Sequence, residues 1–156
     1  MPSRRERKLI AKNRSAHHEY FIEETYECGV ELSGTEVKSL RERGCQISDT
    51  FALIRGGECW LMGAHIHPYS HGSIFNRDPD RRRKLLLHRK EIDHLDQKLR
   101  TRGYALVPLE LYFNDQGRVK LMLGLGRGKK LYDKREDMAK RDMQREIERA
   151  LKERSR

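Results

Sequence analysis

Two pairs of short strand-like segments, each pair joined by a turn-forming sequence, constrain the fold of this 156-residue chain more than any other feature. Residues 46–54 and 58–66 have the apolar content of strands, and the arginine and two glycines between them are a hairpin signal. Residues 104–113 and 118–125 repeat this arrangement across a polar turn that ends in glycine. Pro108 marks an edge or a bulge in the first strand of this second pair.

A longer strand and two helices complete the predicted elements. Residues 18–32 alternate apolar and polar side chains as a strand does, with Gly29 as a possible bulge. Thr35 is expected to cap a short helix that ends at Gly44, and a second helix is expected after the leucines at 85–87. Five or so short strands with two inserted helices predict a mainly β fold, and the most economical choice is a small closed barrel of the oligonucleotide-binding (OB) type.

The net charge of +10 is confined to the two ends of the chain. Residues 1–16 carry +5, residues 127–156 carry another +5, and residues 17–126 are neutral. The sequence therefore divides into a basic N-terminal arm, a barrel domain over 17–126 and a basic C-terminal tail. Neutral bodies with basic ends are typical of proteins that bind a polyanion through those ends.

The tail has the composition of a helix that lacks a core to pack on. It contains no Pro, no Gly after Gly128, and acid-first i,i+4 pairs such as Glu148 with Lys152. Its apolar stripe is one residue wide: Ala139, Met143, Ile147 and Leu151. Such a helix is marginal in water, so we expect a tail that folds on a partner. The alternative is a solvated charged helix with no role.

Several classes of protein are disfavoured. No apolar run approaches the 18 residues of a membrane span, and the basic N-terminus lacks the apolar core of a signal peptide, which predicts a soluble, cytoplasmic protein without a membrane partner. Three cysteines without CxxC spacing argue against a disulfide framework and a zinc site. They are Cys28, Cys45 and Cys59.

Few residues suggest catalysis or metal binding. Three histidines look metal-like but have no acid or cysteine that completes the set in sequence: His65, His67 and His71. We therefore expect no metal and no cofactor. His17 and His18 beside Glu19 could act as an acid–base pair, but a surface or RNA-contacting histidine is favoured. The basic run 81–84 also favours RNA contact over an ordinary solvated loop.

Four motifs, spread in order from about residue 13 to the tail, together resemble the SsrA-binding protein family, also called small protein B. The motifs are Asn13-Arg14 with His18–Ile22, Gly34–Arg41, Arg83–Leu87, and Gly128–Lys130 followed by Asp133–Arg135. The resemblance implies an OB-type barrel, without catalytic activity, that binds the tRNA-like domain of transfer-messenger RNA. It also implies a tail that enters the decoding centre and the empty messenger channel of a stalled 70S ribosome and folds there as a helix, with elongation factor Tu in the delivery complex.

The resemblance also implies contact residues. In the body these are Asn13, Glu27 and Leu86, to which we add His18, Tyr20 and Lys84 as candidate RNA-binding residues. In the tail they are Gly128, Lys129, Lys130, Tyr132, Asp133, Lys134, Arg135, Ile147 and Leu151. Glu27 can accept hydrogen bonds from base amino groups, and Tyr132 offers a ring for stacking. For Leu86, burial in the core remains an alternative to RNA contact.

Two other functions stay open at this point. A general translation factor or RNA chaperone on the same fold would bind unrelated structured RNAs about as well. A small nuclease would use His17, His18 and Glu19 and would cleave labelled RNA.

Overall fold

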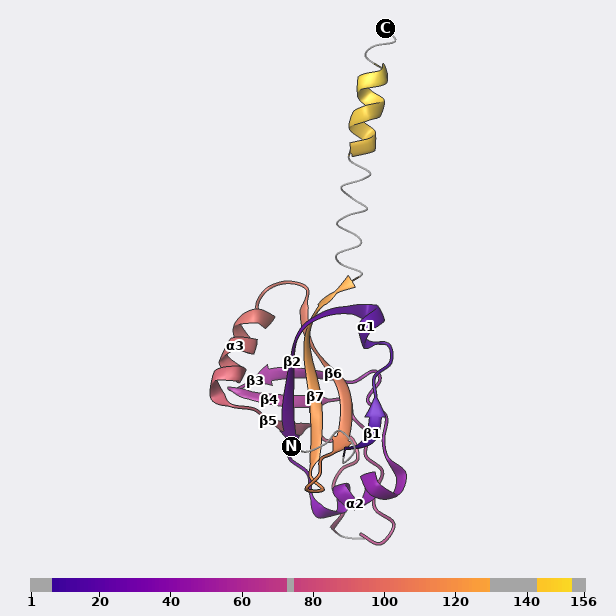
Figure 1. Ribbon diagram of the computed structural model, residues 1–156, viewed down its shortest axis with the longest axis vertical. Helices are drawn as coiled ribbons and strands as arrows, with labels where there is room; N and C mark the ends of the chain where they lie inside the picture. Colours follow the sequence, from indigo (N-terminus) through magenta and orange to yellow (C-terminus); the bar gives the residue numbers. More distant parts are fainter. Residues whose placement is uncertain (1–6, 73–74, 130–142, 153–156) are drawn as a thin grey trace.

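The computed structural model describes residues 7–72, 75–129 and 143–152. Its strands are β1 (Lys8–Lys12), β2 (Tyr20–Val30), β3 (Phe51–Arg55), β4 (Glu58–Met62), β5 (Arg83–Leu86), β6 (Tyr104–Phe113) and β7 (Val119–Gly128). The helices of the body are α1 (Ala16–Glu19), α2 (Gly34–Arg43) and α3 (Arg89–Leu99). Residues 143–152 form a further helix beyond the body (Figure 1).

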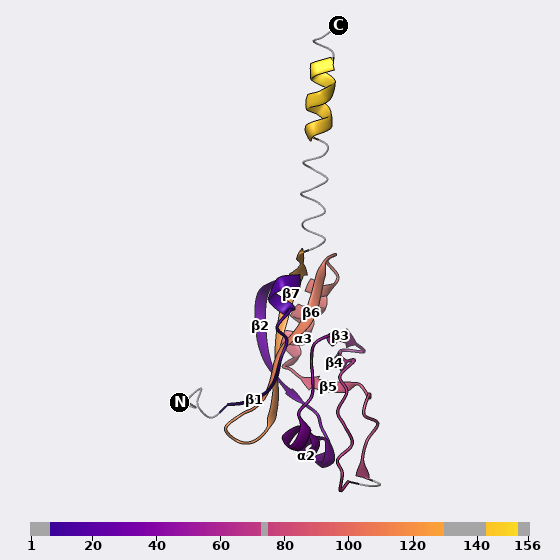
Figure 2. The ribbon, with the colours of Figure 1, turned by 90° about the vertical axis from the view of Figure 1, so that its right-hand side faces the viewer.

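The strands form one antiparallel sheet that closes on itself. Its ring runs β2-β7-β6-β3-β4-β5 and returns to β2, while β1 adds to the edge of β6. The ring is thinnest between β3 and β6, where the ladder consists of Ala52 opposite Leu106. Figure 2 shows β2 and β7 on one side of the barrel and β3, β4 and β5 on the other. The expected mainly β, small closed barrel with α2 and α3 inserted is confirmed.

Helix α2 begins and ends as its sequence dictates, although one residue of the prediction is wrong. The N-cap is Ser33 rather than Thr35: the backbone N–H of Glu36 donates to Ser33 Oγ at 3.3 Å, and the backbone N–H of Ser33 donates to Glu36 Oε1 at 2.9 Å. This reciprocal pair satisfies two N–H groups that a helix start leaves unpaired. Gly44 ends the helix with a φ of 67°, as predicted, because glycine adopts this conformation without strain.

Several strand boundaries differ from the predicted ones for local reasons. The strand expected from residue 46 begins at Phe51, because a turn over 47–50 precedes it with Asp49 at a φ of 65°. The strand expected to reach residue 66 stops before Gly63, whose φ is 79°. In β2 the register shift lies between Ile22 and Glu24 rather than at Gly29.

Two strands were not predicted at all. Residues 8–12, which were assigned from the sequence to the basic N-terminal arm outside the barrel domain, form β1 against β6 of the same chain. Residues 83–86 form β5, where the sequence suggested a basic loop followed by leucines.

The bulge expected at Pro108 is confirmed, since the register between β6 and β7 shifts between Pro108 and Glu110.

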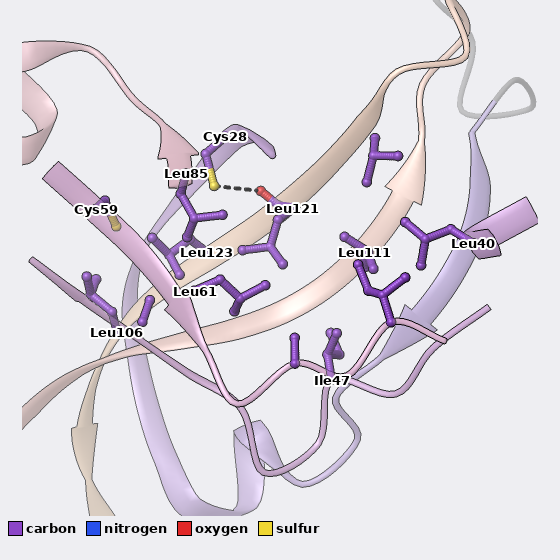
Figure 3. Packing of buried hydrophobic residues seen from close by; sticks show 14 of the residues in the cluster. Cys28, Leu40, Ile47, Cys59, Leu61, Leu85, Leu106, Leu111, Leu121 and Leu123 are labelled. Carbon is purple, nitrogen blue, oxygen red and sulfur yellow. Dashed lines mark hydrogen bonds between the residues drawn. The ribbon is translucent and has the colours of Figure 1, made fainter. Parts of the chain in front are cut away.

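The core fills the ring from inside (Figure 3). Alternate residues of β7, namely Leu121, Leu123 and Leu125, are fully buried there, and Leu95 of α3 covers one end. Each such leucine contributes about 1.5–3 kcal/mol by leaving water. Cys28 and Cys59 lie in the same core, and the Cys28 thiol donates to the carbonyl of Leu121 at 3.3 Å.

A second, smaller apolar cluster lies outside the ring and fixes α1 on the barrel. It consists of Ala16, Val107 and Leu109, with Tyr20, Ile22, Ala105 and Met122 packed against them. A Cβ at Gly124 of β7 would lie 3.0 Å from Leu109 Cδ1 and 3.2 Å from Ile22 Cγ2, so a larger residue would push these side chains apart. The cluster therefore positions the start of β2.

A buried ionic network ties the start of β5 and the residues just before it to α2. Arg83 is completely buried, and its guanidinium donates to Glu36 Oε2 at 2.9 and 3.1 Å and to the carbonyl of Ala64 at 2.5 Å. Arg81 also donates to the Glu36 carboxylate. In the described part of the chain, every buried side-chain nitrogen or oxygen has a hydrogen-bond partner. The network therefore satisfies the charges that it buries.

Residues 143–152 of the tail form an exposed helix. All ten residues of 143–152 are helical and exposed, including those of the apolar stripe. Residues 143–152 are thus helical in this structure, and folding of the tail on a partner stays a prediction. The segment contains neither Gly nor Pro, and Glu148 precedes Lys152 by one turn in the favourable order. The rest of the tail beyond Lys129 lies outside the described residues.

Candidate nucleic-acid interface

Strand β5 presents two of the predicted contact residues on the outside of the barrel. Arg83 and Leu85 point inward and are buried, so Lys84 and Leu86 point outward. Leu86 is 52% exposed and lies over Gly29 of β2, where a Cβ would come within 3.3 Å of its Cδ1. The alternative of core burial for Leu86 is therefore wrong. Lys84 Nζ lies 3.2 Å from Glu58 Oε2.

Glu27 of β2 is held by residues of two other segments. The hydroxyl of Tyr112, on β6, donates to the Glu27 carboxylate, and Arg7 Nη2 lies 3.4 Å from the same oxygen. The guanidinium carbon of Arg7 also lies 4.7 Å from the centroid of the Tyr112 ring. Burial and the hydrogen bond to Glu27 raise the pKa of Tyr112, so its hydroxyl stays a donor. Because the Glu27 side chain is half-exposed, its carboxylate can also accept from a ligand.

Asn13 has structural partners in this fold. Its Nδ2 donates to the carbonyl of Pro108 at 3.0 Å, its Oδ1 accepts from Ser15 Oγ at 3.1 Å, and the side chain is buried. These bonds hold the turn between β1 and α1 against β6. Contact of Asn13 with RNA stays a prediction, and the structure adds a role for Asn13 in positioning α1.

The tail leaves the barrel beside α1 (Figure 1). Lys129 Nζ donates to the carbonyl of His17 at 2.5 Å and lies 4.9 Å from the centroid of the Phe21 ring. The backbone N–H of Gly128 donates to the carbonyl of Gly103 at 3.0 Å. His18 follows His17 on α1 and is exposed.

The predicted body residues fall into separate groups. Asn13 and Tyr20 line one groove of about 550 Å³, together with Phe51 and Leu53 of β3. This groove follows the thin seam between β3 and β6. None of the other predicted body residues on β2 and β5 lines this groove: Leu86 lies beside Gly29, where β2 and β5 pair, and Glu27 lies beside Tyr112 of β6. The prediction therefore covers more than one surface of the barrel.

Most of the predicted tail residues are beyond what the structure describes. Gly128 and Lys129 are described, and Ile147 and Leu151 are exposed on the terminal helix. The remaining predicted residues lie outside the described ranges: Lys130, Tyr132, Asp133, Lys134 and Arg135. Their contacts stay predictions.

The aromatic part of a surface on β3 and β4, beside the basic run 81–84, was not predicted from the sequence. Trp60 points outward from β4, and the guanidinium carbon of Arg82 lies 4.1 Å from the centroid of its ring. Phe51 of β3 is 51% exposed. Alternation within residues 58–62 could have indicated that Trp60 faces outward, but the partner Arg82 could not be identified without the fold.

The histidines that were considered for metal binding and for catalysis have the following surroundings. His65 Nδ1 lies 2.6 Å from Asp80 Oδ1 and its ring contacts His67, whereas His71 contacts Tyr69. Within the described residues, no group of three or more potential ligands could hold a metal ion. The same residues contain no helix long and apolar enough to cross a membrane. His17, His18 and Glu19 are all exposed on α1.

A small closed barrel with exposed cations and aromatic rings on its strands, extended by a basic terminal segment, has the architecture of an RNA-binding protein of OB type. A family model described as "SmpB protein" matches residues 10–153. The chain belongs to this family.

Curated relatives are similar to this chain over almost the whole length of both sequences. An SsrA-binding protein of Geotalea uraniireducens is 57% identical over 149 residues, which cover 96% of this chain and 98% of the relative. An SsrA-binding protein of Fervidobacterium nodosum is 51% identical over 145 residues, with 93% and 97% covered. A chain in a solved structure described as "tmRNA-SmpB: a journey to the center of the bacterial ribosome" is 50% identical, with a TM-score of 0.62 over 76% of this chain and 82% of that one.

Proposed function

We propose that this protein binds the tRNA-like domain of transfer-messenger RNA and delivers the RNA to stalled ribosomes for trans-translation in the cytoplasm. The observation that carries the proposal is the identity of more than half of the residues to SsrA-binding proteins over nearly the full length of both chains. The solved neighbour, described as tmRNA-SmpB in the ribosome, supports the same partners. The protein acts by binding, without catalysis and without a cofactor.

In the body, the RNA contacts come from Glu27, Lys84 and Leu86. Glu27 accepts from base amino groups, Lys84 approaches a phosphate, and the half-exposed Leu86 packs on a base or sugar. Asn13 and Tyr20 contribute from the groove beside β3, and His18 from α1.

The tail contacts the ribosome. Cations between Lys129 and Arg135 meet phosphates of the decoding centre, and Tyr132 stacks on a base. The stripe of the terminal helix, with Ile147 and Leu151, rests on a surface of the empty messenger channel. Because an intact messenger would occupy that channel, binding of the tail selects stalled ribosomes. Elongation factor Tu accompanies the protein during delivery.

Truncation after Gly128 tests the division between body and tail. Strand β7 ends at Gly128, so this truncation leaves the barrel complete. Affinity for transfer-messenger RNA is expected to stay within about threefold of the full chain, while tagging of a stalled nascent peptide on 70S ribosomes is lost. Truncation after Lys152, which keeps the described helix, serves as the matched control. Equal loss of both activities on removal of the tail would contradict the division.

A binding competition separates this function from that of a general RNA chaperone. Unrelated structured RNAs of equal length are expected to displace transfer-messenger RNA only at much higher concentration. Equal displacement would instead support the general translation factor or chaperone.

A further inference from the structure

We propose that Trp60, on the outer face of β4, and Arg82, just before β5, form a platform on which an unpaired loop base of the tRNA-like domain stacks. The inference rests on the proposed function, which it deepens by naming a second contact surface. The platform is the face made by Phe51, Leu53, Arg55, Trp60, Arg82 and Lys84. It lies on the side of the barrel that carries β3, β4 and β5 (Figure 2).

Strand alternation directs these side chains outward. Cys59 and Leu61 are buried in the core, so Trp60 between them faces away from it. The indole is fixed at its edge, since Trp60 Nε1 donates to the carbonyl of Arg55 at 3.4 Å. Arg82 lies over the ring, with its guanidinium carbon 4.1 Å from the centroid. The guanidinium is a planar cation, and its contact with the ring restricts its motion.

The neighbours of Trp60 suit the other parts of a nucleotide. Lys84 is directly opposite Trp60 across the β4–β5 ladder, and Leu53 is opposite it across the β3–β4 ladder. Lys84 and the exposed Arg55 supply positive charge for a phosphate, and with Arg82 they outnumber the acid Glu58 that pairs with Lys84. Phe51, the half-exposed first residue of β3, offers a second aromatic ring.

These features together favour a nucleotide over a protein partner. A guanidinium plane and aromatic rings stack on bases of any sequence, and the surrounding excess of cations complements a phosphate backbone. The face is also continuous with the proposed transfer-messenger RNA contact, because Lys84 and Leu86 belong to the same strand. The base must be unpaired, since a base within a duplex does not expose its face.

Trp60 is the single tryptophan of the chain, so its emission reports on the platform directly. The probes are a transcript of the tRNA-like domain and a blunt RNA duplex of the same length, each added to the full chain. Saturation with the transcript is expected to quench Trp60 emission, and saturation with the duplex is expected to leave it nearly unchanged. Quenching by both RNAs to the same degree, or by neither, would overturn the platform.

Fluorescence anisotropy of the labelled transcript measures binding independently of Trp60. If the transcript binds without a change in Trp60 emission, the platform is overturned while the proposed function stands. If the transcript does not bind, the proposed function fails, and the platform fails with it.

Variants at Arg82 separate stacking from charge. Arg82→Lys keeps the charge but removes the plane, and Arg82→Gln removes both. One stacked base corresponds to about a 5- to 150-fold change in affinity, so both variants are expected to weaken transcript binding by a factor in that range. Arg118→Gln, in the exposed turn between β6 and β7, is the charge-matched control and should bind like the wild type. Wild-type affinity of Arg82→Lys would show that charge alone suffices and would overturn stacking.

A second variant guards against unfolding as the cause. Trp60→Leu keeps apolar bulk on β4 but removes the flat ring, and its circular dichroism should match that of the wild type. It is expected to weaken the binding of the transcript and not of the duplex. Equal weakening of both RNAs would overturn the proposal.

Discussion

Replacing Glu36 with Gln should destabilise the barrel more than almost any other single polar substitution in the body. The Glu36 carboxylate is the shared acceptor of Arg81 and Arg83, and its side chain is 5% exposed. Glutamine keeps the shape of the side chain but removes the charge. The guanidinium of Arg83, which is completely buried, would then lack its counter-ion.

The expected magnitude follows from that burial. Removing one partner of a buried ion pair costs about 3–5 kcal/mol, because the remaining charge stays out of water. Arg81 is partly exposed and can turn to solvent, so Arg83 accounts for most of the loss. For a chain of this size the midpoint of thermal unfolding falls about 2–4 °C per kcal/mol, which gives a decrease of roughly 6–20 °C.

The dependence on pH gives a second, independent readout. Burial raises the pKa of Glu36, but hydrogen bonds from Arg81, from the backbone N–H of Ser33 and from Arg83 lower it by more, so it lies below the usual 4.5. A carboxyl group whose pKa is lowered on folding stabilises the fold fully above its unfolded pKa and loses this contribution as the pH falls through its folded pKa. The stability difference between wild type and Glu36→Gln should therefore be constant from pH 7 to about 5 and shrink below about 4.5.

Urea unfolding followed by Trp60 emission measures both effects. Asp93→Asn is the control, since the pair of Arg89 with Asp93 is exposed on α3 and separated by 4.0 Å. It should change the free energy of unfolding by no more than ~1 kcal/mol. The reasoning is refuted if Glu36→Gln is as stable as this control, or if the difference from wild type grows rather than shrinks in acid.

Three further results are expected. Ile147→Pro should spare binding to transfer-messenger RNA but impair tagging, because proline costs about 3 kcal/mol inside a helix. Ile147→Ala keeps the helix and so shows whether the side chain or the helix is needed. Normal tagging by the proline variant would contradict the role of the helix. Deleting residues 1–7 should reduce the slope of log affinity against log salt concentration by about 0.7–0.9 for each phosphate that the arm neutralises. An unchanged slope would show that these residues do not contact the RNA backbone. Labelled RNA incubated with pure protein should stay intact, and cleavage that His18→Ala abolishes would instead support the nuclease.

The sequence predicted the hairpins, and it failed where charged residues are buried. The β3–β4 and β6–β7 turns carry their own glycine signals, which need no tertiary context. By contrast, β5 was hidden because Arg83 interrupts its apolar pattern, and only the fold supplies Glu36 as the buried partner. β1 was missed since Leu9 and Ile10 alone give too short a pattern. The cap of α2 could have been found, because Ser33 with Glu36 has the spacing of a capping box.

Predictions about the interface divide in the same way. The resemblance to a family supplied Leu86, and the structure then showed it exposed, which no periodicity argument could decide. The structural role of Asn13 could not be predicted from the sequence, because its hydrogen bond to the carbonyl of Pro108 joins two segments that are 95 residues apart in the chain. The pairing of Trp60 with Arg82 likewise depends on the register of β4 and β5.

The burial of the thiols makes the native chain convenient to label. Burial raises the pKa of Cys45 to about 11 and that of Cys59 to about 12, and it also raises the pKa of Cys28. Since the thiolate is the reactive form, we expect the buried Cys28 and Cys59 to react slowly with maleimides at neutral pH, and the half-buried Cys45 to react more slowly than an exposed thiol. A cysteine introduced in place of exposed Met143 would therefore accept a fluorophore selectively, and the arrival of the tail on a ribosome could be followed in a chain that keeps its own three cysteines.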